Sequence, residues 1–239
     1  EMLLQALGRN LDVTVPGPVS NTRSPLLDPT VVKRIQTIPE VLSRRVLGQS
    51  EAVKSVSEAL IAKMGQASTT KALAIFLIGK SGNGKTEMGK AIAEAAFGSP
   101  DRAVVLPFGE IQSESNFSKM FGSDPGLVGS DRSRQFEDAL KTNPNGGVII
   151  LDEVGNMGGG DKALKNHLFK KLYNIVEDRF WTSPVNNHQY DLSKYIFVLT
   201  SNDGEELFQG ITSDDMNMVE WKNNKSREKV RALLLNAGI

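Results

Sequence analysis

Short apolar runs alternate along the chain with segments in which apolar residues recur at helical spacing. Four runs are of strand type, and they occupy residues 73–78, 104–106, 148–151 and 195–199. Helical spacing is found over residues 31–42, 50–64, 117–121, 133–140 and 164–176. Pro39 is expected to break the first of these helices, and Ser50 is expected to cap the second. Because strands alternate with helices, the pattern predicts an α/β fold with a mostly parallel, doubly wound sheet flanked by helices.

Prolines set the beginning of the chain apart from the rest. Four of them, at positions 16, 18, 25 and 29, lie among Gly, Ser and Asn in residues 11–30, a composition typical of an extended linker. The 239 residues are enough for one large α/β domain with an extension. We therefore expect an N-terminal extension and proline-rich linker over residues 1–30 and one folded unit over 31–239.

A glycine-rich octapeptide follows the first strand-like run. Residues 79–86 read GKSGNGKT and fill the pattern G-x-x-x-x-G-K-[ST] of a nucleotide-binding P-loop. A turn that binds nothing is the alternative, but the strand before it and the helix formers after it favour a phosphate site. Glycines let the backbone curl so that successive N–H groups face a phosphate. We expect the backbone of Ser81, Gly82, Asn83 and Gly84 to bind the phosphates in this way.

The last two residues of the octapeptide add charge and an oxygen ligand. Lys85 places an ammonium group near the β- and γ-phosphates, and the hydroxyl of Thr86 suits Mg²⁺, which prefers oxygen ligands. The first turn of the following helix adds N–H donors and the positive end of its dipole. The sequence therefore predicts a site for ATP or ADP together with Mg²⁺.

Polar residues end two of the later strand-like runs. Asp152 and Glu153 follow residues 148–151, and at the end of a buried parallel strand they would lie beside the P-loop. There Asp152 would hold Mg²⁺ and Glu153 would act as general base for the attacking water. Asn202 follows the last run and offers both a donor and an acceptor to water or a γ-phosphate oxygen. Solvated acids and a capping amide are the alternatives, but the order of these residues after a P-loop favours the catalytic roles.

Composition restricts the partners of the chain. Lys and Arg number 28, as do Asp and Glu, so no net positive charge points to nucleic acid, although a local basic patch is left open. There is no cysteine, which excludes disulfides and thiolate zinc sites. The aromatic fraction is 6%, so an aliphatic core is expected. The apolar runs are too short to cross a membrane and no signal peptide is recognised, so we expect a cytoplasmic protein without membrane insertion.

Taken in order, these residues resemble an AAA+ ATPase, in particular the second ATPase module of Clp-type disaggregases and unfoldases. The similarity runs from about residue 45 to residue 202 and includes the stretch RVLGQSEAV at 45–53. The resemblance implies that Val46 and Leu47 help to line the adenine pocket, that Asp152 and Glu153 form Walker B, and that Asn202 is sensor 1. It also implies the P-loop fold of an AAA+ large subdomain that ends before the helical lid. The arginine finger and sensor 2 would then lie beyond the chain, and the isolated chain would be a weak ATPase.

The resemblance further implies a homo-oligomeric ring that remodels or unfolds protein substrates. A nucleotide-gated assembly or scaffold ATPase of a secretion or signalling machine, without threading activity, is the alternative. Two departures favour that alternative: Leu127 stands where unfoldases carry an aromatic pore-loop residue, and the glycine-rich residues 155–161 replace a charged, helix-forming stretch. A DNA-directed AAA+ ATPase is a third possibility, which the balanced charge disfavours.

Overall fold

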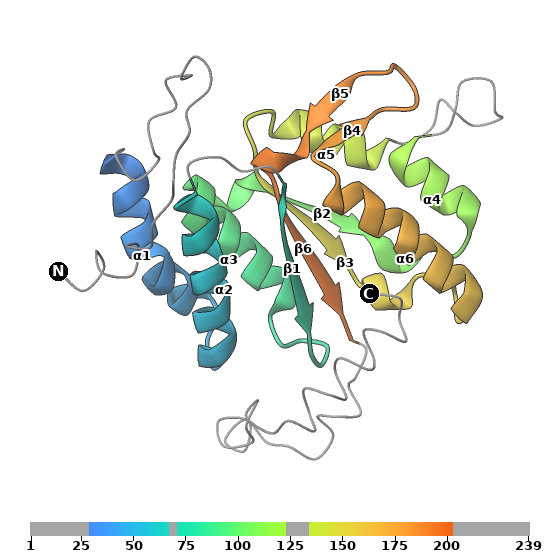
Figure 1. The fold of residues 1–239 in the computed structure, drawn as a ribbon. Coiled ribbons are helices and arrows are strands. Elements are labelled where there is room, and N and C mark those ends of the chain that lie inside the picture. The colour runs from blue at the N-terminus through green and yellow to red at the C-terminus, as the bar shows by residue number, and fades with distance from the viewer. Residues whose placement is uncertain (1–28, 67–70, 123–133, 203–239) are drawn as a thin grey trace, which may run out of the picture.

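The computed structural model describes residues 29–66, 71–122 and 134–202. Within these ranges four strands form one parallel sheet in the order β1-β6-β3-β2, with helices on both faces (Figure 1). The strands are β1 (Leu73–Ile78), β2 (Ala103–Pro107), β3 (Val148–Asp152) and β6 (Ile196–Ser201). Leu73 and Val148 both lie opposite Ile196, so β1, β3 and β6 begin at the same level. The predicted α/β fold is confirmed, and the carboxyl ends of these strands share one edge.

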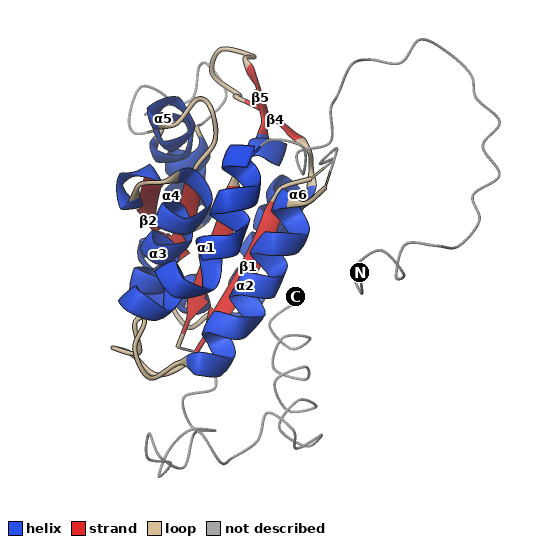
Figure 2. Cartoon of the chain, turned by 90° about the vertical axis from the view of Figure 1, so that its left-hand side faces the viewer, coloured by secondary structure: helices blue, strands red, loops and turns tan. Residues whose placement is uncertain are grey.

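Three helices cover one face of the sheet: α1 (Pro29–Arg45), α2 (Ser50–Met64) and α3 (Lys85–Phe97) (Figure 2). The side chains buried between them and the sheet are aliphatic, and they include Ile38, Leu42, Ile92, Ile150 and Val198. Helix α3 lies very close to β3, because a Cβ on Gly89 would stand only 2.4 Å from Cδ1 of Ile150. A larger residue at position 89 would therefore push the P-loop helix away from the sheet.

Two details of these helices differ from the sequence expectations. Helix α1 continues through Pro39 to Arg45, so the expected break is wrong. Proline removes one helical hydrogen bond, but Ile38 and Leu42 beside it are fully buried and hold the helix on the core. Ser50 does not cap α2 but is its first residue, and Gln49 occupies the cap position without a side-chain hydrogen bond.

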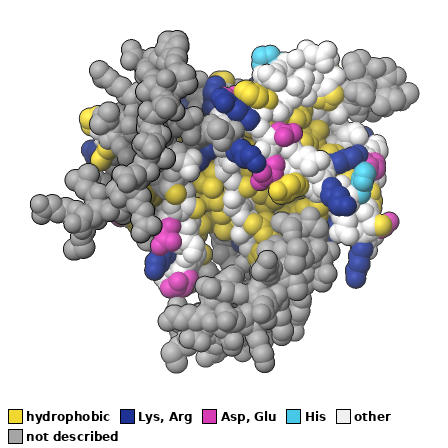
Figure 3. Space-filling model, in the orientation of Figure 1, with side chains coloured by type: hydrophobic (Ala, Val, Ile, Leu, Met, Phe, Trp, Pro, Cys, Tyr) yellow, Lys and Arg dark blue, Asp and Glu magenta, His cyan; other side chains and the backbone are white. Residues whose placement is uncertain are grey.

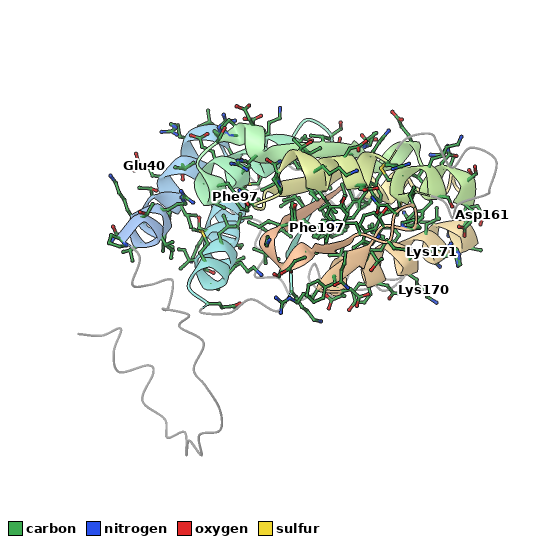
Figure 4. All side chains as sticks on the ribbon, turned by 90° about the horizontal axis from the view of Figure 1, so that it is seen from above. Glu40, Phe97, Asp161, Lys170, Lys171 and Phe197 are labelled. Atoms are coloured by element: carbon green, nitrogen blue, oxygen red, sulfur yellow. The ribbon has the colours of Figure 1, made fainter. Side chains whose placement is uncertain are left out.

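The opposite face carries α4 (Glu114–Phe121), α5 (Gln135–Thr142) and α6 (Lys162–Glu177). Its core combines aliphatic with aromatic side chains: the ring of Phe136 stands edge-on to Trp181 at 5.0 Å and stacks on Phe197 at 6.2 Å, measured between ring centres. In the view from above, Phe197 lies inside the molecule and Lys170 at its outer side (Figure 4). The expectation of an aliphatic core is thus correct for the first face, whereas this face adds to its aliphatic residues a concentration of the aromatic ones.

Several short elements were not predicted. Strands β4 (Phe180–Thr182) and β5 (Gln189–Asp191) form an antiparallel hairpin between α6 and β6, at the amino edge of the sheet (Figure 1). Single 3₁₀ turns occupy Pro100–Arg102, Phe108–Glu110, Val154–Asn156 and Leu192–Lys194. Elements of three residues are too short to produce a recognisable period in the sequence.

Hydrophobic side chains are visible in the middle of the face shown in Figure 3, around β1. This strand is an edge strand of the described sheet, and none of its six residues is fully buried. None of the helices in the described ranges is both long and apolar enough to span a membrane. Of the extension expected over residues 1–30, residues 1–28 lie outside the described residues, as does the chain after residue 202, whereas residues 29 and 30 begin α1.

Candidate nucleotide-binding site

The P-loop joins the carboxyl end of β1 to the amino end of α3. Gly82 and Gly84 have φ angles of 82° and 76°, in the left-handed region that favours glycine. Gly84 is the residue that precedes α3, and no side chain caps the helix there. The amino end of α3 therefore presents its first N–H groups and its dipole to the loop, as an anion site requires.

Lys85 joins the P-loop to the end of a strand that is distant in sequence. Its Nζ donates to the carbonyl oxygens of Gly79 and Lys80, at 2.7 and 2.8 Å, and to Oδ1 of Asn202 at 2.8 Å. The amide of Asn202 thus stands beside the P-loop cation, because β6 lies next to β1 in the sheet. The structure brings together these two residues, which the sequence placed in one site.

Thr86 and Asp152 are also in direct contact. The hydroxyl of Thr86 donates to Oδ1 of Asp152 at 3.1 Å, across the gap between α3 and β3. Two oxygen atoms this close and only partly buried can serve as ligands of a single hard cation. The residues present therefore fit the Mg²⁺ ion that the sequence predicts.

Thr200, two residues before Asn202, also belongs to this group and was not predicted from the sequence. Its side chain is 1% exposed. Oγ1 donates to Oδ1 of Asp152 at 2.7 Å and accepts the backbone N–H of Glu153 at 2.9 Å. One hydroxyl thus holds both acidic residues in place. No local pattern could have revealed this contact, since it depends on β6 lying beside β3.

Glu153 has an unusual backbone and a defined side-chain position. Its φ is 56°, which is uncommon for a residue other than glycine. Oε2 accepts from Nδ2 of Asn156 at 3.0 Å. A Cβ on Gly109 would lie 3.0 Å from the same oxygen, so the absence of a side chain at position 109 gives the carboxylate its space. Asn156 and Gly109 were not predicted from the sequence.

The glycine-rich residues that follow Asp152 and Glu153 form a tight turn. Gly158, Gly159 and Gly160 all have positive φ angles, and the N–H of Gly158 donates to the carbonyl of Ile111 at 2.9 Å. A Cβ on Gly159 would stand 2.4 Å from Oε1 of Gln112. Glycine is therefore required here by both conformation and space.

Val46 and Leu47 occupy different environments on the turn between α1 and α2. Val46 is 6% exposed and packs in the aliphatic core, whereas Leu47 is 81% exposed. The turn lies at the same end of the molecule as the P-loop, because the neighbouring Arg45 pairs with Glu87 in the first turn of α3. Leu127 lies outside the described residues, so its role in a pore loop stays a prediction.

A second polar cluster lies at the opposite, amino edge of the sheet. Glu137 is fully buried, and its carboxylate accepts hydrogen bonds from Ser183, Asn186 and Tyr190 of the hairpin and pairs with Lys141. Burial alone would raise the pKa of Glu137, but these partners outweigh it and lower the pKa to about 2. A cleft of about 670 Å³ opens beside this cluster. The cluster attaches the hairpin to α5 and has no contact with the nucleotide site.

Comparison with known proteins agrees with this geometry. Residues 70–236 match the model of the AAA domain (Cdc48 subfamily), and the chain belongs to this family. It is a Clp-type AAA+ ATPase module. The chain is 30% identical over 234 residues to the chaperone protein ClpB of Lactococcus lactis subsp. cremoris. The aligned region covers 97% of this chain and 25% of that protein. It is 31% identical to ClpB of Aquifex aeolicus over 202 residues, or 83% of this chain and 19% of the relative.

A solved structure is similar as well. It is the closed-state reconstruction of Hsp104 with ATPγS and FITC-casein, with a TM-score of 0.62 and 25% identity over 88% of this chain and 35% of that one. The chain spans about a quarter of the length of the curated relatives it matches.

Proposed function

We propose that this chain is the large subdomain of a Clp-like AAA+ module that binds and hydrolyses ATP, and that the full-length protein uses it to remodel or unfold protein substrates in a homo-oligomeric ring. One observation carries the proposal: at one edge of the sheet, Lys85 is hydrogen-bonded to Asn202 and Thr86 to Asp152. These residues come from three separate segments and supply the charges and oxygen ligands that a nucleoside triphosphate and its metal ion need.

Each residue of the site has a defined task in this proposal. The backbone N–H groups of Ser81, Gly82, Asn83 and Gly84 hold the phosphates. Lys85 neutralises charge on the β- and γ-phosphates. Thr86 and Asp152 hold Mg²⁺, which when bound would neutralise charge that develops on the phosphate oxygens. Val46 and Leu47 contribute to the adenine site, the first through the core and the second by direct contact.

The hydrolytic step is carried by Glu153 and Asn202. Glu153 accepts a proton from the attacking water as its oxygen bonds to the γ-phosphorus and the bond to the β-phosphate oxygen breaks. Asn202 orients the water or a γ-phosphate oxygen. In the structure Asn202 is hydrogen-bonded to Lys85 and Glu153 to Asn156. Asn202 exchanges this partner when phosphate takes up Lys85, whereas the second oxygen of Glu153 can accept from water while Asn156 stays in place.

The remodelling role is supported by the similarity to the ClpB chaperones and to the structure of Hsp104 with casein. These similarities favour protein remodelling over the scaffold function. A cytoplasmic location and the absence of nucleic-acid partners belong to the same proposal.

Calorimetric titration with ATP tests the nucleotide site directly. Lys85→Ala should weaken binding at least about tenfold, since it removes a charge-assisted hydrogen bond to phosphate. Lys80→Ala is the matched control, because this loop residue contacts Lys85 through its carbonyl oxygen, which the substitution retains. Equal affinities for Lys85→Ala and the unsubstituted protein would refute the proposal.

A further inference from the structure

The end of α1 is attached to the P-loop helix by one arginine. Nε of Arg45 lies 2.5 Å from Oε2 of Glu94, and its Nη1 lies 2.5 Å from Oε1 of Glu87. The two carboxylates interact with different nitrogens of the same planar guanidinium group. Such a two-point contact restricts both the sliding and the rotation of one helix against the other.

The position of these carboxylates links the contact to the nucleotide site. Glu87 directly follows Thr86, and Glu94 lies about two turns further along α3. Arg45 therefore holds the part of α3 that begins at the P-loop. The side chains of Arg45 and Glu94 are 27% and 21% exposed, so this pair is less accessible to solvent than a typical surface ion pair.

The residues on the other side of Arg45 form the turn that presents Leu47. Val46 is buried in the aliphatic core and its N–H donates to the carbonyl of Leu42 at 2.9 Å. Leu47 is 81% exposed, and Gly48 completes the turn with a φ of 72°. The leucine side chain is thus held out of the core at the P-loop end of the molecule, two positions after the arginine that pairs with α3.

We propose that Arg45 is a positioning residue that fixes the distance between the P-loop helix and Leu47, and thereby makes the site select a complete nucleotide over its phosphates alone. The inference rests on the proposed function, since it takes Leu47 as a contact for the base. Arg45 itself touches neither base nor phosphate. Its loss leaves the P-loop able to hold phosphates but frees the base-contacting turn to move relative to it.

Arg44 provides a matched control on the same helix. Its Nη2 lies 2.6 Å from Oε1 of Glu94, but its side chain is 61% exposed, and this ion pair joins it to one carboxylate of α3. Exposed pairs of this kind contribute little to stability. Arg44→Ala removes an equal charge from the same end of α1 without removing the two-point contact.

The test compares the affinities of ADP and inorganic pyrophosphate for the full-length protein, by calorimetry. Pyrophosphate is the part of ADP that lacks adenosine, and neither ligand is hydrolysed by the site. Arg45→Ala should weaken ADP binding about tenfold, because the turn no longer holds Leu47 at the distance that the base needs, and change pyrophosphate binding less than about twofold. Arg44→Ala should leave both affinities within about twofold of those of the unsubstituted protein. Leu47→Ala should weaken ADP binding and spare pyrophosphate binding, as Arg45→Ala does.

Other outcomes overturn the inference. Equal weakening of ADP and pyrophosphate by Arg45→Ala would mean that the arginine supports the P-loop or the fold as a whole. No change in either affinity would mean that the ion pairs have no role in binding. If Arg45→Ala does not fold, Glu87→Gln removes one carboxylate partner at a more exposed position and should show the same selectivity on a smaller scale.

Lys85→Ala separates the failure of this inference from failure of the proposed function. It should weaken both ligands, whatever the Arg45 variants do. If the unsubstituted protein binds neither ADP nor pyrophosphate, the nucleotide site and the role of Arg45 are both refuted. If both ligands bind and Lys85→Ala weakens them, but Arg45→Ala shows no selectivity, the nucleotide site stands and only the positioning role is refuted.

Discussion

Nζ of Lys85 donates a 2.8 Å hydrogen bond to Oδ1 of Asn202, a residue 117 positions further along the chain. The contact exists because Ile78, which ends β1, lies opposite Ser201, which ends β6. The P-loop and the tip of β6 therefore leave the sheet side by side. The ammonium group donates to three oxygen atoms of the protein, and phosphate oxygens of a bound nucleotide would take their place.

Asn202→Ala should leave ATP affinity within about threefold and lower the turnover number, since the other hydrogen bonds of Lys85 are retained and the amide that orients the reacting groups is lost. Steady-state hydrolysis by the full-length protein, combined with calorimetric titration, measures the two quantities. A rise in KM with an unchanged turnover number would contradict the role assigned to Asn202.

Glu153→Gln should retain ATP binding and lower the turnover number by about 10²–10⁴-fold, because an amide does not accept the proton of the attacking water. Single-turnover hydrolysis of labelled ATP gives the rate of the chemical step. Asn156→Ala is a useful comparison, since it removes the hydrogen bond to Oε2 but retains the base. Normal turnover by Glu153→Gln would exclude this residue as the base.

Thr200→Val should reduce both stability and metal-dependent hydrolysis. It replaces the hydroxyl by a methyl group of similar size and leaves Oδ1 of Asp152 and the N–H of Glu153 without this partner. Loss of such buried hydrogen bonds costs about 1–3 kcal/mol of unfolding free energy. Urea unfolding and the Mg²⁺ dependence of ATPase activity measure the two effects. Thr142→Val, which removes an exposed helix hydroxyl, should change neither.

Glu137 should make the stability of the protein depend on pH in the acid range. Its pKa is lowered to about 2 in the folded state, against about 4.3 in an unfolded chain. The resulting stabilisation is fully present above about pH 4.3 and is lost as the pH falls toward 2, and it amounts to about 3 kcal/mol. Urea unfolding at several pH values should show this slope diminished in Glu137→Gln. The exposed Glu58→Gln should retain it.

Most features that were predicted correctly from the sequence are specified by residues that are contiguous in the chain. The P-loop between strand and helix, the acidic pair after β3 and the asparagine after β6 are each local patterns, and their chain order indicated the family. The two core helices 50–64 and 164–176 were also predicted within two residues of their observed ends. A local pattern suffices in these cases because a strand end, a glycine turn or a helix face is specified by neighbouring residues.

Only the tertiary structure decided which residues support the site. Thr200 reaches Asp152 because β6 lies between β1 and β3, and Arg45 reaches Glu87 because α1 crosses α3 on one face of the sheet. Pro39 stays inside a helix because its neighbours are buried, against its own local preference. Such contacts join residues tens of positions apart, and their partners are selected by strand order and helix packing, for which a stretch of sequence carries no signal of its own.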